Sequence, residues 1–113
     1  MSSTNIACAQ IDCVLGDPKT NLNKITSLIR SAAERDAKLV MFPECALTGY
    51  AFSSLAEAVP FAEEINGPSS EAIATTCRDT GAYAVVGFIE AAENKCYNGA
   101  MLVRPDGVVG SYR

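Results

Sequence analysis

The sequence predicts an α/β domain in which short apolar strands alternate with helices. Two continuous apolar runs, at Leu39–Phe42 and Tyr83–Ile89, have the length and composition of buried strands. Apolar residues at helical spacing precede each run, and strands separated by helices form parallel sheets. The chain has 113 residues, of which 49% are hydrophobic, as in one small globular domain. We find no repeat, linker or low-complexity tract that would divide residues 1–113.

The first part of the chain predicts a βαβ unit with a right-handed crossover. Ile6–Gln10 is a short apolar strand. A helix then begins with Asp17 as its N-cap and Pro18 at the first helical position. We expect this helix to end at Asp36, a position that glycine would occupy more easily. Its apolar face is formed by residues at helical spacing, namely Leu22, Ile25, Leu28, Ile29 and Ala32.

The middle of the chain predicts a second helix after a less regular segment. Between residues 46 and 66 the pattern is weak, and Leu55–Phe61 fits either a short helix or an ordered loop. Gly67–Pro68 marks the next helix start, which we expect to run to about Thr80. Gly81 then provides a left-handed end for the helix.

The last third predicts a β-hairpin beside the Tyr83–Ile89 strand. Tyr97–Val103 and Val108–Tyr112 are apolar segments on either side of Arg104-Pro105-Asp106-Gly107. Proline, aspartate and glycine in this order are typical of a tight turn. The predicted order of elements is therefore β-α-β-α-β-β-β.

Composition excludes several classes of function. The net charge is −4 and no basic cluster is present, so we expect no nucleic-acid or membrane partner. The chain has no histidine, P-loop or G-x-G-x-x-G motif, so we expect no metal site and no cofactor. No apolar stretch could span a membrane, and the N-terminus lacks the pattern of a signal peptide. The five cysteines show no C-x-x-C spacing and indicate a reducing cytoplasm: Cys8, Cys13, Cys45, Cys77 and Cys96.

Glu44 is the strongest candidate for a catalytic residue. It follows the Leu39–Phe42 strand directly after Pro43, at the end of a strand where ligands collect in open α/β sheets. We expect apolar neighbours to remove it partly from water, which favours a general base. The alternative is an ordinary solvated loop residue.

The order and spacing of several segments resemble the opening of the nitrilase, or carbon–nitrogen hydrolase, superfamily. No single motif is specific, but the similarity extends over essentially the whole chain. The segments that carry it are Ile6–Gln10, Gly16-Asp17-Pro18 with Asn21, Phe42-Pro43-Glu44, Thr48-Gly49-Tyr50, Gly67-Pro68, Val86-Gly87-Phe88, Tyr97-Asn98-Gly99-Ala100 and Gly110-Ser111-Tyr112-Arg113.

This resemblance implies the N-terminal part of a four-layer α-β-β-α sandwich that hydrolyses amides, nitriles or carbamoyl compounds. Such enzymes use a Glu-Lys-Cys triad, in which Glu44 matches the general base. The lysine follows the Tyr-Arg pair, which is Tyr112–Arg113 here, and the cysteine comes later. Residues 1–113 would then be an incomplete domain. The resemblance also implies a small amide-like substrate and, in the complete enzyme, a homo-oligomer.

Two further residues match positions near the family's active site. Tyr50 would line the substrate pocket or pack as a structural aromatic residue, and Asn98 would contact the site or fix the hairpin backbone. We expect no cysteine to replace the missing nucleophile. Cys45 neighbours Glu44, but adjacent side chains in an extended segment point to opposite sides. We expect Cys8 and Cys77 to be core residues and Cys13 and Cys96 to lie in loops. Arg113 could pair with an acid near the pocket, but we expect it to be mobile.

Three functional hypotheses follow. The first is the N-terminal part of a carbon–nitrogen hydrolase, and the second is an inactive short protein that acts as an interaction module. A third, a small Rossmann-like nucleotide binder, has the strand-helix-strand order but no glycine motif after the first strand. Half of a sandwich would leave one apolar face of its sheet uncovered, which favours association with a partner.

Overall fold

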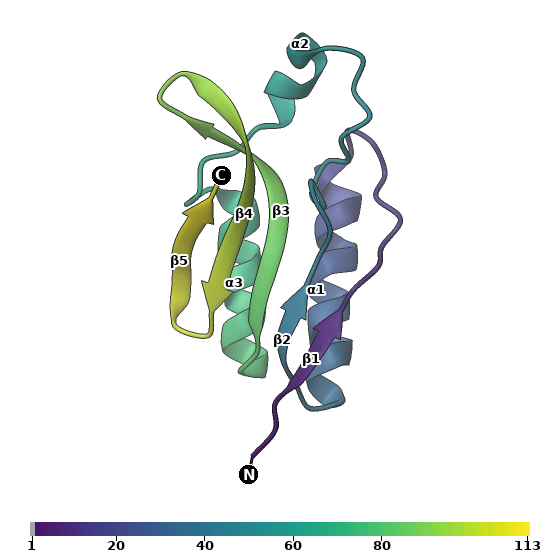
Figure 1. Cartoon of the computed structure of the whole chain (residues 1–113), viewed down its shortest axis with the longest axis vertical. Coiled ribbons are helices and arrows are strands. Elements are labelled where there is room, and N and C mark those ends of the chain that lie inside the picture. Colours follow the sequence, from purple (N-terminus) through teal and green to yellow (C-terminus); the bar gives the residue numbers. More distant parts are fainter. Residues whose placement is uncertain (1) are drawn as a thin grey trace.

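The computed structural model describes residues 2–113 and contains one five-stranded sheet with helices on one side. The strands are β1 (Asn5–Cys8), β2 (Ala37–Met41), β3 (Tyr83–Ala92), β4 (Lys95–Arg104) and β5 (Gly107–Tyr112). The helical elements are α1 (Pro18–Glu34), α2 (Leu55–Ala58), the 3₁₀ turn η1 (Val59–Phe61) and α3 (Pro68–Thr80). Figure 1 shows the sheet with its strands in chain order.

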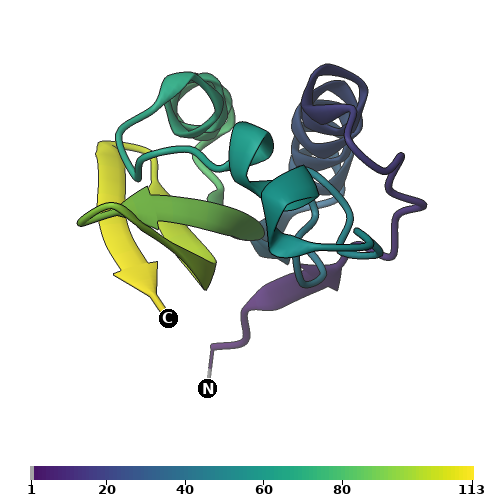
Figure 2. The ribbon, with the colours of Figure 1, turned by 90° about the horizontal axis from the view of Figure 1, so that it is seen from above.

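The sheet has a parallel half and an antiparallel half. β1, β2 and β3 pair in parallel, whereas β3, β4 and β5 pair as antiparallel neighbours. The two parallel connections carry α1 and α3, and both helices lie on the same face of the sheet (Figure 2). This arrangement is expected, because two crossovers of the same hand that advance in the same direction along a sheet place their helices on one side. We call the opposite side the open face.

The core lies between the two helices and the sheet. α1 contributes Ile25 and Ile29, α3 contributes Ile73, and all three are fully buried. They pack with Phe88 of β3 and Met101 of β4. The apolar face predicted for the first helix is therefore confirmed at Ile25 and Ile29, but Leu28, which was also assigned to it, is exposed. The core position of Cys77 is confirmed.

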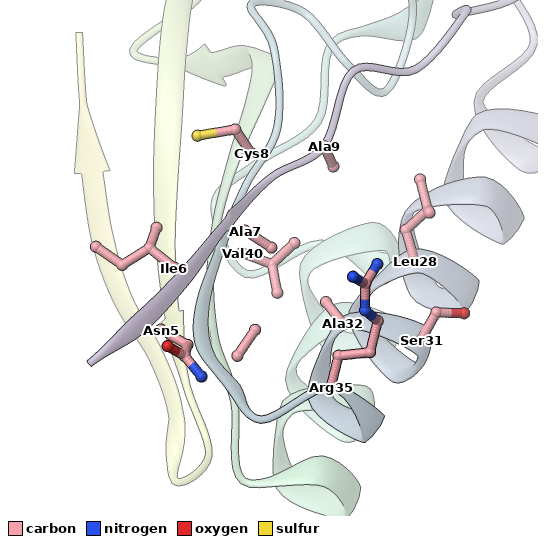
Figure 3. Close-up of a pocket in the computed structure, with 11 residues that line it drawn as sticks. Asn5, Ile6, Ala7, Cys8, Ala9, Leu28, Ser31, Ala32, Arg35 and Val40 are labelled. Carbon is pink, nitrogen blue, oxygen red and sulfur yellow. The ribbon is translucent and has the colours of Figure 1, made fainter. Parts of the chain in front are cut away.

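The open face is apolar and uncovered, as expected for half of a sandwich. Its exposed side chains come from all five strands and belong to Ile6, Met41, Tyr83, Leu102 and Tyr112. Figure 3 shows Ile6 and Cys8 pointing away from α1, whereas Ala7 and Val40 lie on the helix side. The prediction that Cys8 is a core residue is therefore wrong, since Cys8 is exposed on the open face.

The helix ends follow the predicted capping chemistry. The Asp17 carboxylate accepts hydrogen bonds from the Thr20 backbone N–H at 3.1 Å and the Thr20 hydroxyl at 2.7 Å. Asp36 follows α1 with a φ of 63°, in the left-handed region, and Gly81 ends α3 with a φ of 77°. Both predicted ends of the helices are thus confirmed.

Several strands begin or end at other residues than predicted, because pairing with a neighbouring strand sets their ends. β1 ends at Cys8 instead of Gln10, because the chain leaves the edge of the sheet there. β2 is Ala37–Met41 rather than Leu39–Phe42. β3 and β4 extend past their apolar segments, since the hairpin between them continues to the Ala92–Lys95 pair. Cys96 therefore lies in a strand and not in a loop.

Asn21 ties together the two loops that follow β1 and β2. It is fully buried on α1, where its side chain accepts from the Val14 backbone N–H at 2.8 Å. Its amide nitrogen donates to the Val14 carbonyl at 2.8 Å and the Leu47 carbonyl at 2.9 Å. These three bonds fix the Leu47 end of the loop that carries Glu44.

Replacing Asn21 with alanine should lower the free energy of unfolding by about 3 kcal/mol, because buried backbone groups would lose their partners. Denaturant unfolding monitored by circular dichroism measures this loss. Asn23→Ala on the exposed side of the same helix is the matched control and should change stability little. Equal destabilisation by the two variants would contradict the role assigned to Asn21.

Candidate active site

Glu44 lies in a short loop after β2, and a backbone hydrogen bond to β3 holds the loop at each end. The Phe42 backbone N–H donates to the Val85 carbonyl at 2.9 Å, and the Leu47 N–H donates to the Gly87 carbonyl at 3.3 Å. The intervening residues cross directly over Gly87 on the open face. A Cβ atom at Gly87 would lie 2.5 Å from the Cys45 nitrogen and 2.9 Å from the Glu44 carbonyl carbon. Glycine is therefore required for this close approach.

Asn98 holds the Glu44 carboxylate. It lies on β4 and faces the open side of the sheet, where its amide nitrogen donates to Glu44 Oε1 at 2.5 Å. Asn98 and Glu44 are both exposed in this chain. The expectation that apolar neighbours would desolvate Glu44 is therefore wrong for residues 2–113, because the open face is uncovered. The hydrogen bond leaves the second carboxylate oxygen, Oε2, available to a reacting group.

Cys45 also contacts Asn98, contrary to the argument from side-chain alternation. Its thiol donates to Asn98 Oδ1 at a sulfur–oxygen distance of 3.9 Å, so one amide bridges Glu44 and Cys45. The alternation argument fails because Cys45 has a φ of 47° and is not extended. Burial, and secondarily the negative charge of Glu44, raises the pKa of the Cys45 thiol. A thiol of this kind stays protonated near neutral pH and is a poor nucleophile.

Tyr50 lies beside Glu44 on the rim of a shallow groove of about 320 Å³. The structure thus brings Glu44, Tyr50 and Asn98 together, although Tyr50 is 70% exposed and packs little. The remaining wall of the groove is mostly apolar and includes Phe52, Leu55, Ala58 and Ile89. Phe52 stacks on Phe61 with ring centroids 5.7 Å apart, which supports this wall. No lysine is among the described residues that line the groove.

The sequence analysis did not single out Glu90, the buried acid that forms an ion pair with the partly exposed Arg113. Glu90 is only 3% exposed, and its carboxylate accepts from Arg113 Nε at 3.1 Å. The expectation that Arg113 is mobile is therefore wrong. Strand alternation contained a signal, because Ala84, Val86 and Phe88 point into the core and place Glu90 on the same face.

Neither a metal-binding cluster nor a membrane-spanning helix is found among residues 2–113. Within residues 2–113 no cluster of three or more Cys, Asp or Glu side chains is arranged to hold a metal ion. Over the same residues, no helix combines the length and the apolar character needed to cross a membrane.

Known proteins share both the sequence pattern and the fold. The family model for carbon–nitrogen hydrolases matches residues 5–113. A nitrilase of Pyrococcus abyssi is 35% identical over 109 residues, which are 96% of this chain and 42% of the nitrilase. The ω-amidase NIT2-B of Xenopus laevis is 36% identical over 90 residues, or 79% of this chain and 32% of the ω-amidase.

A solved structure shows the same arrangement of elements. It is a carbon–nitrogen hydrolase superfamily protein of Xanthomonas campestris with an arsenic adduct in its active site. The TM-score is 0.84 at 25% identity, and the alignment covers 99% of this chain and 40% of that one. The chain thus spans less than half the length of each of these relatives. From the matched residues and the shared fold, we conclude that the chain belongs to the carbon–nitrogen hydrolase family.

Proposed function

We propose that this chain supplies the general base, Glu44, of a hydrolase that acts on a small amide, nitrile or carbamoyl substrate. The observation that carries the proposal is the Asn98–Glu44 hydrogen bond, which holds one carboxylate oxygen of a residue that lines the groove and leaves the other oxygen free of it. In this proposal residues 1–113 are an incomplete domain. The lysine and cysteine of the Glu-Lys-Cys triad belong to sequence beyond residue 113.

The chemistry assigned to Glu44 is proton transfer. Its carboxylate would take the proton of the cysteine thiol, and the resulting thiolate would attack the carbonyl or nitrile carbon. The lysine and a backbone N–H would stabilise the negative charge that develops on the substrate oxygen or nitrogen. With an amide or carbamoyl substrate, protonated Glu44 would return the proton to the leaving amine. With a nitrile it would protonate the thioimidate nitrogen, and addition of one water molecule would release ammonia and leave the thioester. The same carboxylate would then activate a water molecule to hydrolyse the thioester.

The open face supports the same proposal. In the four-layer sandwich that the resemblance implies, a second sheet covers this face and encloses Glu44. Covering would also exclude bulk water from the groove where the reaction is proposed to occur. The proposal also includes a homo-oligomer and, from the five unpaired cysteines, a cytoplasmic location.

The exposed apolar face equally favours the second hypothesis, a catalytically inactive protein that binds a partner through its sheet. Sequencing the reading frame beyond codon 113 and determining the intact mass of the native protein separate the two. A frame that continues with a lysine and later a cysteine supports the hydrolase. A native mass that matches 113 residues supports the interaction module.

The activity assay is ammonia release from a panel of primary amides and nitriles by the full-length native protein. We expect turnover of at least one member and a covalent acyl adduct, detectable by mass spectrometry, when the reaction is stopped early. Absence of turnover and adduct across the panel, with a correctly folded protein, would overturn the proposal.

A further inference from the structure

The Glu90 carboxylate accepts more hydrogen bonds than any other charged side chain of residues 2–113, and two of them come from Arg113. The buried Glu90 carboxylate accepts from Arg113 Nε at 3.1 Å and Nη2 at 3.2 Å, and from the Ser111 hydroxyl at 2.8 Å. The Arg113 guanidinium also lies 4.1 Å from the centre of the Tyr97 ring. The hydrogen bond from Arg113 holds the pKa of Glu90 below its usual value, so the carboxylate stays charged.

Strand register connects this ion pair to Glu44. β4 and β5 are antiparallel, and Ala100 is paired with Tyr112. Continuing this ladder places Gly99 opposite Arg113 and Asn98 opposite the position that follows Arg113. Side chains directly opposite one another in such a pair have Cβ atoms about 5 Å apart. The next position of the ladder therefore neighbours the residue that holds Glu44.

Side-chain alternation gives the direction of that next side chain. Arg113 points to the helix side, where it meets Glu90 and Tyr97. The following residue of an extended strand points to the other side, which is the open face. Glu44 and Asn98 meet on this face.

We propose that Glu90 and Arg113 are positioning residues whose ion pair fixes the end of β5 so that the next side chain is presented to Asn98 and Glu44. This inference rests on the proposed function, in which that side chain is the lysine of the triad. β5 is an edge strand that pairs with β4 alone, so backbone hydrogen bonds hold it on one side only. The planar guanidinium adds a side-chain anchor, because it engages the Glu90 carboxylate through two nitrogens and the Tyr97 ring through its face.

The test uses the full-length protein with Glu90→Gln and with Arg113→Lys. Glutamine keeps the shape of Glu90 without its charge, and lysine keeps the charge of Arg113 without its fork. Asp79→Asn is the matched control, because it breaks the exposed Arg30–Asp79 pair at 3.2 Å, where both side chains are about half exposed. Two quantities are measured: amide hydrogen exchange over residues 110–113, and kcat and KM for the best substrate.

We expect both variants to exchange at least about tenfold faster over residues 110–113 and to lose about 100-fold in kcat, with a smaller change in KM. The double variant should lose no more than the worse single variant, because both residues act through one contact. The control should change neither quantity.

Each other outcome overturns a defined part of the inference. If amide hydrogen exchange over residues 110–113 is unchanged in both variants, the Glu90–Arg113 pair does not fix β5, whatever happens to the activity. Faster exchange with unchanged kcat shows that the fixed strand does not position a reacting group. If the parent protein hydrolyses nothing, the proposed function fails, and exchange alone decides whether the pair holds β5. If Glu90→Gln does not fold, Arg113→Lys decides, because the Arg113 side chain is 39% exposed.

Discussion

Replacing Glu44 with glutamine is expected to lower kcat of the full-length protein by about 10³-fold, within the usual range for loss of a general acid–base. Glutamine retains an oxygen that can accept the Asn98 hydrogen bond, so the loop should keep its position. It cannot take a proton from a thiol, so neither the nucleophile nor the hydrolytic water would be activated. Because glutamine has the size of glutamate and can keep the Asn98 hydrogen bond, the melting temperature should change little. Steady-state ammonia release and thermal melting measure the two effects.

The matched control is Glu64→Gln, which removes an exposed carboxylate from another part of the surface. It should leave kcat and melting temperature at parental values. Mass spectrometry after a short reaction adds a direct test, since Glu44→Gln should show no acyl adduct. Retention of more than a tenth of the parental turnover by Glu44→Gln would argue against its role as the base.

Replacing Gly87 with alanine is expected to have the largest effect on stability, a loss of about 3 kcal/mol or more. The added methyl group would meet the Pro43 carbonyl oxygen and lie 2.5 Å from the Cys45 nitrogen. These neighbours are backbone atoms of a loop that is hydrogen-bonded to β3 on either side, through the N–H groups of Phe42 and Leu47, so they cannot move away without breaking those bonds. Overpacking typically costs 1–3 kcal/mol, and rigid surroundings place this site at the upper end or beyond. Denaturant unfolding measures the loss.

The same substitution should also reduce activity, because it displaces the loop that carries Glu44. A shift of about 1 Å at a reacting group can lower the rate about 100-fold. Gly110→Ala is the matched control: Gly110 is also a strand glycine, and an added Cβ there meets no atom within 4 Å. Parental stability in Gly87→Ala would show that the loop does not depend on the absence of a side chain at this position.

Much of the fold follows from local patterns in the sequence. The apolar spacing of α1, the capping by Asp17, and the left-handed positions of Asp36 and Gly81 each depend on residues close in the chain. The loop of Glu44 was also predictable, because an apolar strand that stops at a proline identifies the end of the strand. Errors fell at strand ends, where pairing with a neighbouring strand extends or shortens the element beyond its apolar residues.

At the candidate site, two predictions made from neighbouring residues were wrong. Cys45 was expected to point away from Glu44, but its left-handed backbone turns its thiol to the same asparagine. Arg113 was expected to be mobile, but the buried carboxylate of Glu90, 23 positions away, binds it. Neither contact can be derived from residues adjacent in sequence, because each joins side chains from segments far apart in the chain.

The α/β class, the order of the elements and the loop that presents Glu44 can all be predicted from the amino-acid pattern, since they depend on hydrophobic periodicity and on turn residues a few positions apart. Which side chains meet at the site depends on how the distant segments fold together. Asn98 reaches Glu44 across 54 positions, and Gly87 makes room for that loop from a strand formed much later in the chain. The physical reason is that alternation in a strand assigns side chains to two faces, whereas the register between strands decides which residues share a site.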